Sequence, residues 1–182
     1  MSSERTVSAL DVEILKKIRA SVATFMEDVS ARYATAPGLL LDVAPQVHAG
    51  ARPYFGPQVR VETLDIDPKA GCTYTEDLCS CTNSMLLSRF DYVVCTEVLE
   101  HTRQPFAAAA QLGKMLKPGG YCFVTTPFNF RIHGPLPDCW RFTEHGLREL
   151  FRDFEVVELT SIDAADRFLM PYHYRLVVRR GC

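Results

Sequence analysis

Short apolar runs that each end in a polar residue constrain the fold of this chain more than any other feature. Four of them follow one another: LLLD at 39–42, VETLDID at 61–67, FDYVVCTEVLEHT at 90–102 and LKPGGYCFVTTP at 116–127. Runs of this kind are typical of strands buried on both faces of a parallel sheet. Ligands of open α/β sheets bind at the carboxyl ends of such strands, so these polar residues mark a candidate site.

The spacing of apolar residues predicts one α/β domain over 1–182, with an N-terminal helical segment at 1–36 and a core at 37–182. Helices are predicted over 10–33 with Ser8 as N-cap, over 106–116 up to a Lys-Pro-Gly-Gly turn, and from a Thr143 cap to about residue 151. Strands are predicted at 38–43, 59–65, 72–75, 91–95, 121–126, 154–161 and 172–179. Since no helix separates the last two, they should form an antiparallel hairpin at the edge of a seven-stranded, mostly parallel sheet.

Four motifs carry a family resemblance: TLDIDP at 63–68, FDYVVCTEVLEH at 90–101, LKPGG at 116–120 and HGPLPDCWRFTEHGL at 133–147. Together they resemble class I, Rossmann-like S-adenosylmethionine-dependent methyltransferases of the small stand-alone type. The resemblance runs from about residue 39 to residue 180 and implies S-adenosyl-L-methionine as the cofactor. The closing hairpin, the missing glycine-rich dinucleotide motif and the missing Tyr-x-x-x-Lys pair disfavour a nicotinamide-dependent reductase.

The resemblance assigns the ribose of the cofactor to Asp65, at the end of the second strand. A carboxylate there can accept hydrogen bonds from both ribose hydroxyls, and Ile66 would lie against the adenine face. The alternative is a helix cap or a solvated turn, which Asp67 could provide equally well.

Two further cofactor contacts follow the third and fourth strands. The resemblance places Asp77 near the adenine amino group and Leu78 beside the ring, although Glu76 cannot be separated from Asp77 by sequence and an exposed acidic turn is the alternative. Thr96 and Glu97 would lie near the methionine portion, where their backbone could matter more than their side chains. The first helix would either cover the cofactor pocket or simply pack on the sheet.

The loop after the first strand departs from the family pattern, which places glycines at alternating positions so that backbone N–H groups can approach the cofactor. Asp42 stands at the acidic position, but the glycine positions hold Ala44, Gln46 and His48. Either the loop takes a different path and holds the methionine end with side chains such as that of Gln46, or cofactor binding is weakened or lost. We favour a working variant, because a decaying pocket would not retain Asp65 together with the other motifs.

Histidines on the carboxyl side of the sheet are candidate catalytic bases. His133 follows the fifth strand and His101 follows the fourth, and a neutral imidazole can take a proton from an alcohol or phenol near pH 7. The alternative for His101 is a structural residue at the start of a helix, and Asp138 with Arg141 would brace the loop. The aromatic loop 128–141 should form one wall of the acceptor pocket.

These residues favour methylation of a small-molecule acceptor, at an oxygen atom, since the available bases are histidines. A catalytically silent methyltransferase-like subunit that binds or activates a partner protein is the alternative, and a homodimer or partner subunit stays open. The formal net charge of −2 and the absence of a Lys/Arg run disfavour nucleic acid. With no apolar run near the roughly 20 residues that span a bilayer, we expect no membrane segment and a cytoplasmic protein.

The seven cysteines are an odd number, which argues against a closed disulfide framework. Cys72, Cys79 and Cys81 could supply thiolates to zinc, but no second C-x-x-C and no suitably spaced histidine completes a site. We therefore expect reduced thiols and no metal, with Cys95 and Cys122 buried inside strands.

Overall fold

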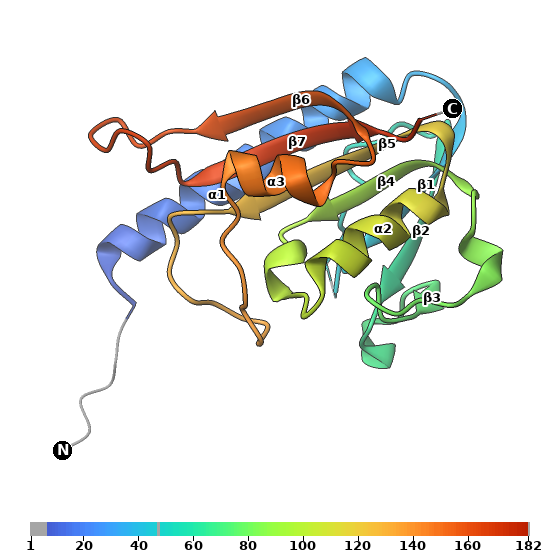
Figure 1. The fold of residues 1–182 in the computed structure, drawn as a ribbon, viewed down its shortest axis with the longest axis horizontal. Helices are drawn as coiled ribbons and strands as arrows, with labels where there is room; N and C mark the ends of the chain where they lie inside the picture. Colours follow the sequence, from blue (N-terminus) through green and yellow to red (C-terminus); the bar gives the residue numbers. More distant parts are fainter. Residues whose placement is uncertain (1–6, 47, 182) are drawn as a thin grey trace.

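The computed structural model describes residues 7–46 and 48–181, which form a seven-stranded sheet in the order β3-β2-β1-β4-β5-β7-β6 (Figure 1). Its strands are β1 (Gly38–Val43), β2 (Val59–Asp65), β3 (Tyr74–Thr75), β4 (Phe90–Thr96), β5 (Leu116–Pro127), β6 (Glu155–Ile162) and β7 (His173–Arg179). β7 runs antiparallel to β5 and β6, whereas the remaining neighbours pair in parallel. The predicted fold class, including the closing hairpin, is confirmed.

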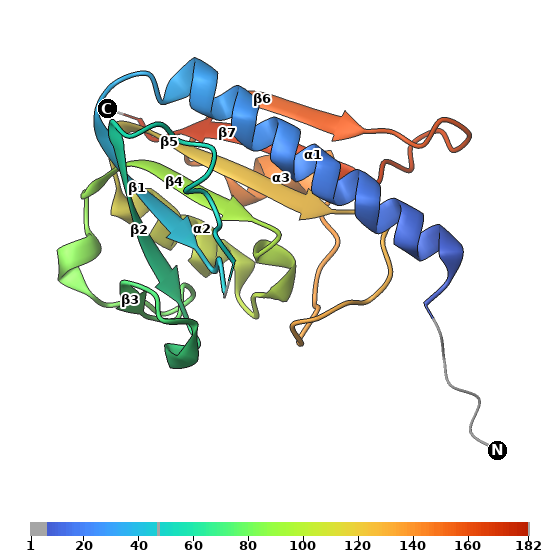
Figure 2. The same cartoon turned by 180° about the vertical axis from the view of Figure 1, so that it is seen from behind.

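Within the described residues three α-helices cover the sheet: α1 (Ala9–Tyr33), α2 (Pro105–Met115) and α3 (Glu144–Leu150). α1 crosses one face over β5 and β7, while α2 and α3 lie on the opposite face (Figures 1 and 2). Both predicted caps are present, because the Ser8 and Thr143 side chains accept hydrogen bonds from backbone N–H groups in the first turns of α1 and α3. None of the helices in the described part of the chain is both long and apolar enough to cross a bilayer.

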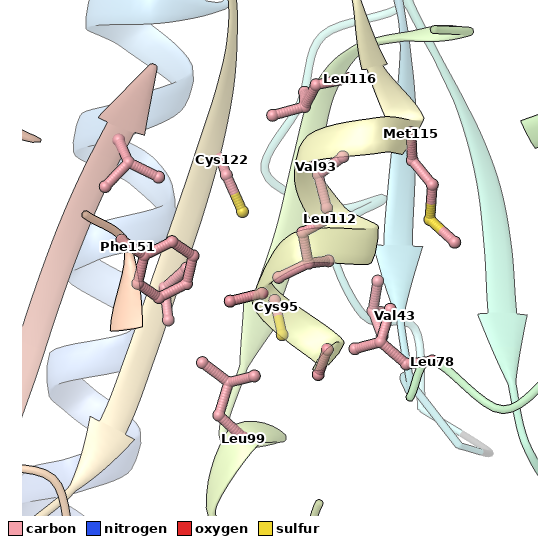
Figure 3. Close-up of a cluster of buried hydrophobic side chains, with 14 of the residues drawn as sticks. Val43, Leu78, Val93, Cys95, Leu99, Leu112, Met115, Leu116, Cys122 and Phe151 are labelled. Carbon is pink, nitrogen blue, oxygen red and sulfur yellow. The ribbon is translucent and has the colours of Figure 1, made fainter. Parts of the chain in front are cut away.

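Two hydrophobic cores follow from the two-residue period of the strands. Towards α2 and α3, Val93, Cys95 and Cys122 pack against Leu112 and Phe151 (Figure 3). Towards α1, the alternate residues form the second core, among them Leu40, Val94, Phe123 and Val177. The central strands are therefore buried on both faces, and the two strand cysteines are buried as expected.

Three sequence-based expectations need correction. β5 starts at Leu116, which pairs with Phe90, so the LKPGG segment opens the strand instead of preceding it. β3 is shorter than predicted. His101 does not start a helix: it ends a 3-10 turn, η3 (Leu99–His101), and α2 begins at Pro105, whose fixed φ and missing N–H suit the first helical position.

Candidate active site

A cleft of about 680 Å³ opens at the carboxyl ends of β1 and β4, on the face of the sheet that α1 covers. One wall is α1, with Ile18 and Met26 among the lining residues, and the others are the loop after β1 and residues 130, 131 and 133–135 of the loop after β5. The latter loop hangs from the end of β5, below the strand ends in Figure 2. α1 therefore lines the cleft as well as packing on the sheet.

The loop after β1 adopts the backbone conformation that its sequence would normally avoid. Ala44 and Gln46, which occupy glycine positions of the family pattern, have φ angles of 54° and 56°. The left-handed region is unfavourable for residues with a Cβ atom by about 1 kcal/mol or more each. The glycine-type bends are therefore kept without glycine at these two positions, and both residues line the cleft.

Asp42 anchors this loop from below. Its side chain is buried, and Oδ2 accepts a hydrogen bond of 2.7 Å from the backbone N–H of Ala51. Burial raises the pKa of Asp42 to about 6. Gly50 lies at φ 58°, and a Cβ atom there would come within 2.0 Å of Asp42 Oδ2. Gly50 thus leaves room for the anchoring carboxylate.

Asp65 ends β2 beside this loop and is 4% exposed. Its Oδ2 accepts from the Gln46 N–H at 3.3 Å and its Oδ1 from the Asp67 N–H at 2.9 Å. The cap of the following 3-10 turn is Asp67, which accepts from the Lys69 N–H, so Asp65 is not the cap. The neighbouring Ile66 is 66% exposed, although neither Asp65 nor Ile66 lines the cleft.

Asp77 and Leu78, the two residues expected to contact adenine after β3, are less accessible to a ligand than the sequence suggested. Asp77 is exposed, but its carboxylate closes a turn by accepting from the Cys79 N–H and the Ser80 hydroxyl. Leu78 is buried in the core on the α2 side (Figure 3), so its side chain offers little surface to an adenine ring. Neither residue lines the cleft, whereas Thr96 does.

His101 and His133 come together on the wall of the cleft, over the buried carboxylate of Glu100. The Nε2 atoms of His101 and His133 lie 3.6 Å and 3.7 Å from Glu100 Oε1, and the two rings meet edge to face. Asp138 lies on the other side of His133 and is paired with Arg141, so the predicted loop brace is present. The backbone N–H of His133 donates to Asp138 Oδ2 at 2.9 Å.

Electrostatics distinguish the titratable groups of this cluster. Burial raises the pKa of Glu100 to about 7, and the Glu100 carboxylate in turn raises the pKa of His133. Burial lowers the pKa of His101. Two imidazoles that share one carboxylate thus differ in proton affinity, which is the condition for assigning acid and base roles.

Glu97 lines the cleft, and its side chain contacts one residue of β5 and one of β7. Its φ is 55°, its Oε1 accepts from the Thr125 hydroxyl at 2.9 Å, and the same oxygen lies 2.7 Å from Nε2 of His173. His173 is fully buried. A strained non-glycine residue with buried partners at a strand end is typical of a functional site.

The residues present fit S-adenosylmethionine. A tight backbone loop follows β1, a carboxylate ends β2, an exposed apolar residue follows it, and the open cleft reaches the ends of β1 and β4. Together with the sheet order and closing hairpin, these features define the class of Rossmann-like S-adenosylmethionine-dependent methyltransferases.

A family model described as a methyltransferase domain matches residues 18–160, so the chain belongs to the methyltransferase domain family. Most of the chain therefore lies within a methyltransferase domain. A curated relative, the ubiquinone biosynthesis O-methyltransferase of Proteus mirabilis (strain HI4320), is 35% identical over 54 residues, which are 30% of this chain and 22% of the relative. The match thus spans less than a quarter of that relative's length.

Two solved structures share the fold at low sequence identity. The [4+2]-cyclase SpnF has a TM-score of 0.69 and 16% identity, with 89% of this chain and 82% of that chain covered. The N-methyltransferase NodS from Bradyrhizobium japonicum WM9, in complex with S-adenosyl-L-homocysteine, has a TM-score of 0.66 and 16% identity, with 90% and 87% covered. At such identities the likeness concerns the fold alone.

Glu100 and His173 are site residues that the sequence did not single out. Glu100 stands three positions after Glu97 and directly before His101, so the cluster of acids at the end of β4 was a usable signal. His173 carried no such signal, because its contact with Glu97 depends on β7 pairing beside β5.

Proposed function

We propose that this methyltransferase methylates a hydroxyl oxygen of a small-molecule acceptor. The observation that carries the proposal is the pair His101 and His133, whose Nε2 atoms lie 3.6 Å and 3.7 Å from the buried Glu100 carboxylate on the cleft wall. An imidazole held between carboxylates can take a proton and remain stable as a cation.

S-adenosylmethionine, the cofactor in this proposal, would lie across the carboxyl ends of β1, β2 and β4. Backbone groups of Ala44 and Gln46, with Thr96, would hold the methionine end, and Asp65 would hold the ribose. Asp65 Oδ2 already accepts the Gln46 N–H at 3.3 Å, so ribose binding requires that long hydrogen bond to be shared or released. Ile66, Asp77 and Leu78 would be the adenine neighbours, with Ile66 supplying most of the apolar contact because it is exposed.

The bound cofactor supplies an electrophilic methyl group on a sulfonium sulfur. Methyl transfer is an in-line displacement, so alignment of the acceptor oxygen by the cleft walls supplies most of the acceleration. The acceptor proton would pass to Nε2 of His133, and Glu100 and Asp138 would stabilise the resulting imidazolium. His101, with its lowered pKa, would remain neutral beside it.

Two further observations support this choice. A cleft of about 680 Å³ between α1 and a loop suits a small molecule, and the sequence has no basic run for a nucleic-acid backbone. The curated relative, which this chain matches over part of its length, is named an O-methyltransferase, whereas NodS is named an N-methyltransferase. The choice of oxygen as the methylated atom therefore rests on the two histidines more than on the names of relatives.

The test is transfer of an isotopically labelled methyl group from the cofactor to matched pairs of acceptors, each a phenol or alcohol and its amine analogue. We expect label in the oxygen series and a loss of roughly a hundredfold in turnover for His133→Asn. His145→Asn is the control, since that side chain is exposed on α3. Label in amines only would contradict the oxygen assignment.

A silent subunit that binds a partner is a second candidate. It is favoured by one observation: both oxygens of Asp65 are already engaged by backbone N–H groups of the same chain, in a loop without family glycines at 44 and 46. Calorimetry with S-adenosylhomocysteine separates the candidates. A silent subunit would show no heat of binding. Its activity would be detected instead as a larger molecular mass when it assembles with a partner protein or with a second copy.

A further inference from the structure

Glu100, His101 and His133 present three donor atoms to one point on the cleft wall. Glu100 Oε1 lies 3.6 Å from Nε2 of His101 and 3.7 Å from Nε2 of His133, and the three atoms all lie within 4.8 Å of one another. Ligands of a tetrahedral zinc ion, at bonds of about 2.1 Å, are about 3.4 Å apart. The two distances from Glu100 Oε1 exceed this value by only a few tenths of an ångström, and the two imidazole nitrogens, within 4.8 Å of each other, would approach further through side-chain rotation.

The contact of Nδ1 leaves a lone pair on Nε2 of His101, and the carboxylate beside Nδ1 of His133 favours the same tautomer there. Nδ1 of His101 lies 3.1 Å from the carbonyl oxygen of Pro137, and since a carbonyl only accepts, Nδ1 carries the proton. Nδ1 of His133 lies 3.1 Å from Asp138 Oδ2, a carboxylate fixed by Arg141. A metal-binding histidine usually has a carbonyl or carboxylate behind its other ring nitrogen. His101 has that arrangement, whereas Asp138 lies within reach of Nδ1 of His133 without forming a hydrogen bond with it.

The Glu100 carboxylate lacks the partners that a buried charge requires. The residue is 0% exposed, and neither carboxylate oxygen has a hydrogen-bond partner among the described residues. Burying such a group is unfavourable unless a proton or a cation compensates it. The position is nevertheless well fixed, because the Glu100 carbonyl accepts the backbone N–H groups of Cys139 and Trp140 from the loop that carries His133.

We propose that Glu100, His101 and His133 form a binding site for a divalent first-row transition-metal cation, with Zn²⁺ as the best match. Two imidazoles and one carboxylate suit zinc and its neighbours, whereas Mg²⁺ and Ca²⁺ prefer oxygen ligands throughout. Three protein ligands leave a coordination position open, as in catalytic zinc sites. Both histidines line the cleft, so the open position faces the acceptor. The sequence-based expectation of no metal considered only the cysteines and did not take these three donors into account.

Such a cation would give the cluster a second chemical role, which rests on the proposed function. An acceptor hydroxyl that coordinates the cation loses its proton more readily, because the positive charge stabilises the alkoxide or phenoxide. The O–H bond breaks, the oxygen keeps the electron pair, and the proton leaves to water. His133 would then act as a ligand, since its Nε2 lone pair is held by the cation.

The direct test uses the full chain, treated with a chelator, dialysed, and titrated with Zn²⁺ by calorimetry and with Co²⁺ by visible absorption. We expect one cation per chain and the d–d bands of Co²⁺ in a nitrogen and oxygen site. His101→Ala and His133→Ala should each weaken binding by at least about a hundredfold. His48→Ala is the matched control, because His48 also lines the cleft but lies on another wall. Circular dichroism verifies that each variant is folded.

Two results would overturn the site: no Zn²⁺ or Co²⁺ binding tighter than about 1 mM, or binding that survives both histidine substitutions. Methyl transfer by the chelated enzyme separates this failure from failure of the proposed function. If the wild type binds no metal yet transfers methyl to oxygen, the metal site is refuted and His133 stays the base. If a metal binds but its removal leaves turnover unchanged, the site stands and its role in deprotonating the acceptor is refuted.

Discussion

Nε2 of His173 lies 2.7 Å from Oε1 of Glu97, which links the antiparallel hairpin to the cleft. Because a carboxylate accepts, Nε2 is the donor, and Nδ1 of a neutral His173 accepts from the Ser21 hydroxyl at 2.7 Å. The Arg175 side chain donates to the same hydroxyl oxygen at 2.8 Å, which aims the hydroxyl proton at the histidine. A buried chain of hydrogen bonds thus runs from α1 to Glu97.

Ser21→Ala should disturb this chain while leaving the fold intact. We expect a loss of about 1 kcal/mol in the free energy of unfolding, together with lower turnover, because His173 loses the group that orients it. Ser30→Ala is the control, since Ser30 also lies on α1 and donates one hydrogen bond, to the Tyr54 carbonyl, away from Glu97. Equal turnover in the two variants would show that the chain has no role at the site.

Gly50→Ala should destabilise the protein far more than Gly71→Ala. Both glycines have positive φ, 58° and 66°, so both substitutions carry backbone strain of about 1 kcal/mol. Only at Gly50 would the new methyl group also meet Asp42 Oδ2, at 2.0 Å, whereas nothing lies within 4 Å of it at Gly71. Chemical denaturation measures the difference, and similar losses at both positions would contradict the anchoring role of Asp42.

Asp42→Asn should stabilise the free protein at pH 8 and have little effect near pH 4. Burial raises the pKa of Asp42 to about 6, above its unfolded value of 3.8, so ionisation destabilises the folded state at high pH. The wild type therefore gains stability as the pH falls from about 6 to about 4, and the variant does not. The gap at pH 8 should be about 1 to 3 kcal/mol, measured by denaturation at each pH. A difference in the free energy of unfolding that does not change with pH would refute the raised pKa of Asp42.

Glu62→Gln should show the opposite pH dependence. Burial alone would raise the pKa of Glu62, but contacts with Arg89, Tyr74 and Arg60 outweigh it and lower the pKa to about 2. The carboxylate therefore stabilises the fold above pH 4.5, and this contribution is lost as the pH falls towards 2. We expect the variant to be about 1 to 3 kcal/mol less stable at pH 7 and equal to the wild type near pH 2. A deficit that persists at low pH would point to packing instead of charge.

The fold was predictable because its information is local. Each central strand is an apolar run ended by a polar residue, and Ser8 and Thr143 cap helices by the rule that sequence alone provides. The observed bounds of an element differ from the predicted ones where pairing with a distant strand decides them. Leu116, for example, belongs to β5 because it pairs with Phe90.

The site was predictable only in part. The residues at strand ends were identified, but the conformation of Ala44 and Gln46 contradicts what their side chains favour, so no local rule gives it. The partners of His101 and His133 depend on how the loop after β5 folds back onto Glu100 through the Cys139 N–H. Contacts between segments so far apart in sequence leave no pattern in a single chain.

The most direct test of this account is a calorimetric titration of S-adenosylhomocysteine into the wild type, Asp65→Ala and Asp67→Ala. We predict saturable binding to the wild type, a loss of about 2 to 4 kcal/mol of binding free energy for Asp65→Ala, and near wild-type affinity for Asp67→Ala, because Asp67 caps only the next turn. Unchanged affinity in Asp65→Ala would refute the ribose assignment. Absence of binding to the folded wild type would contradict the central claim that the glycine-poor loop after β1 holds the cofactor.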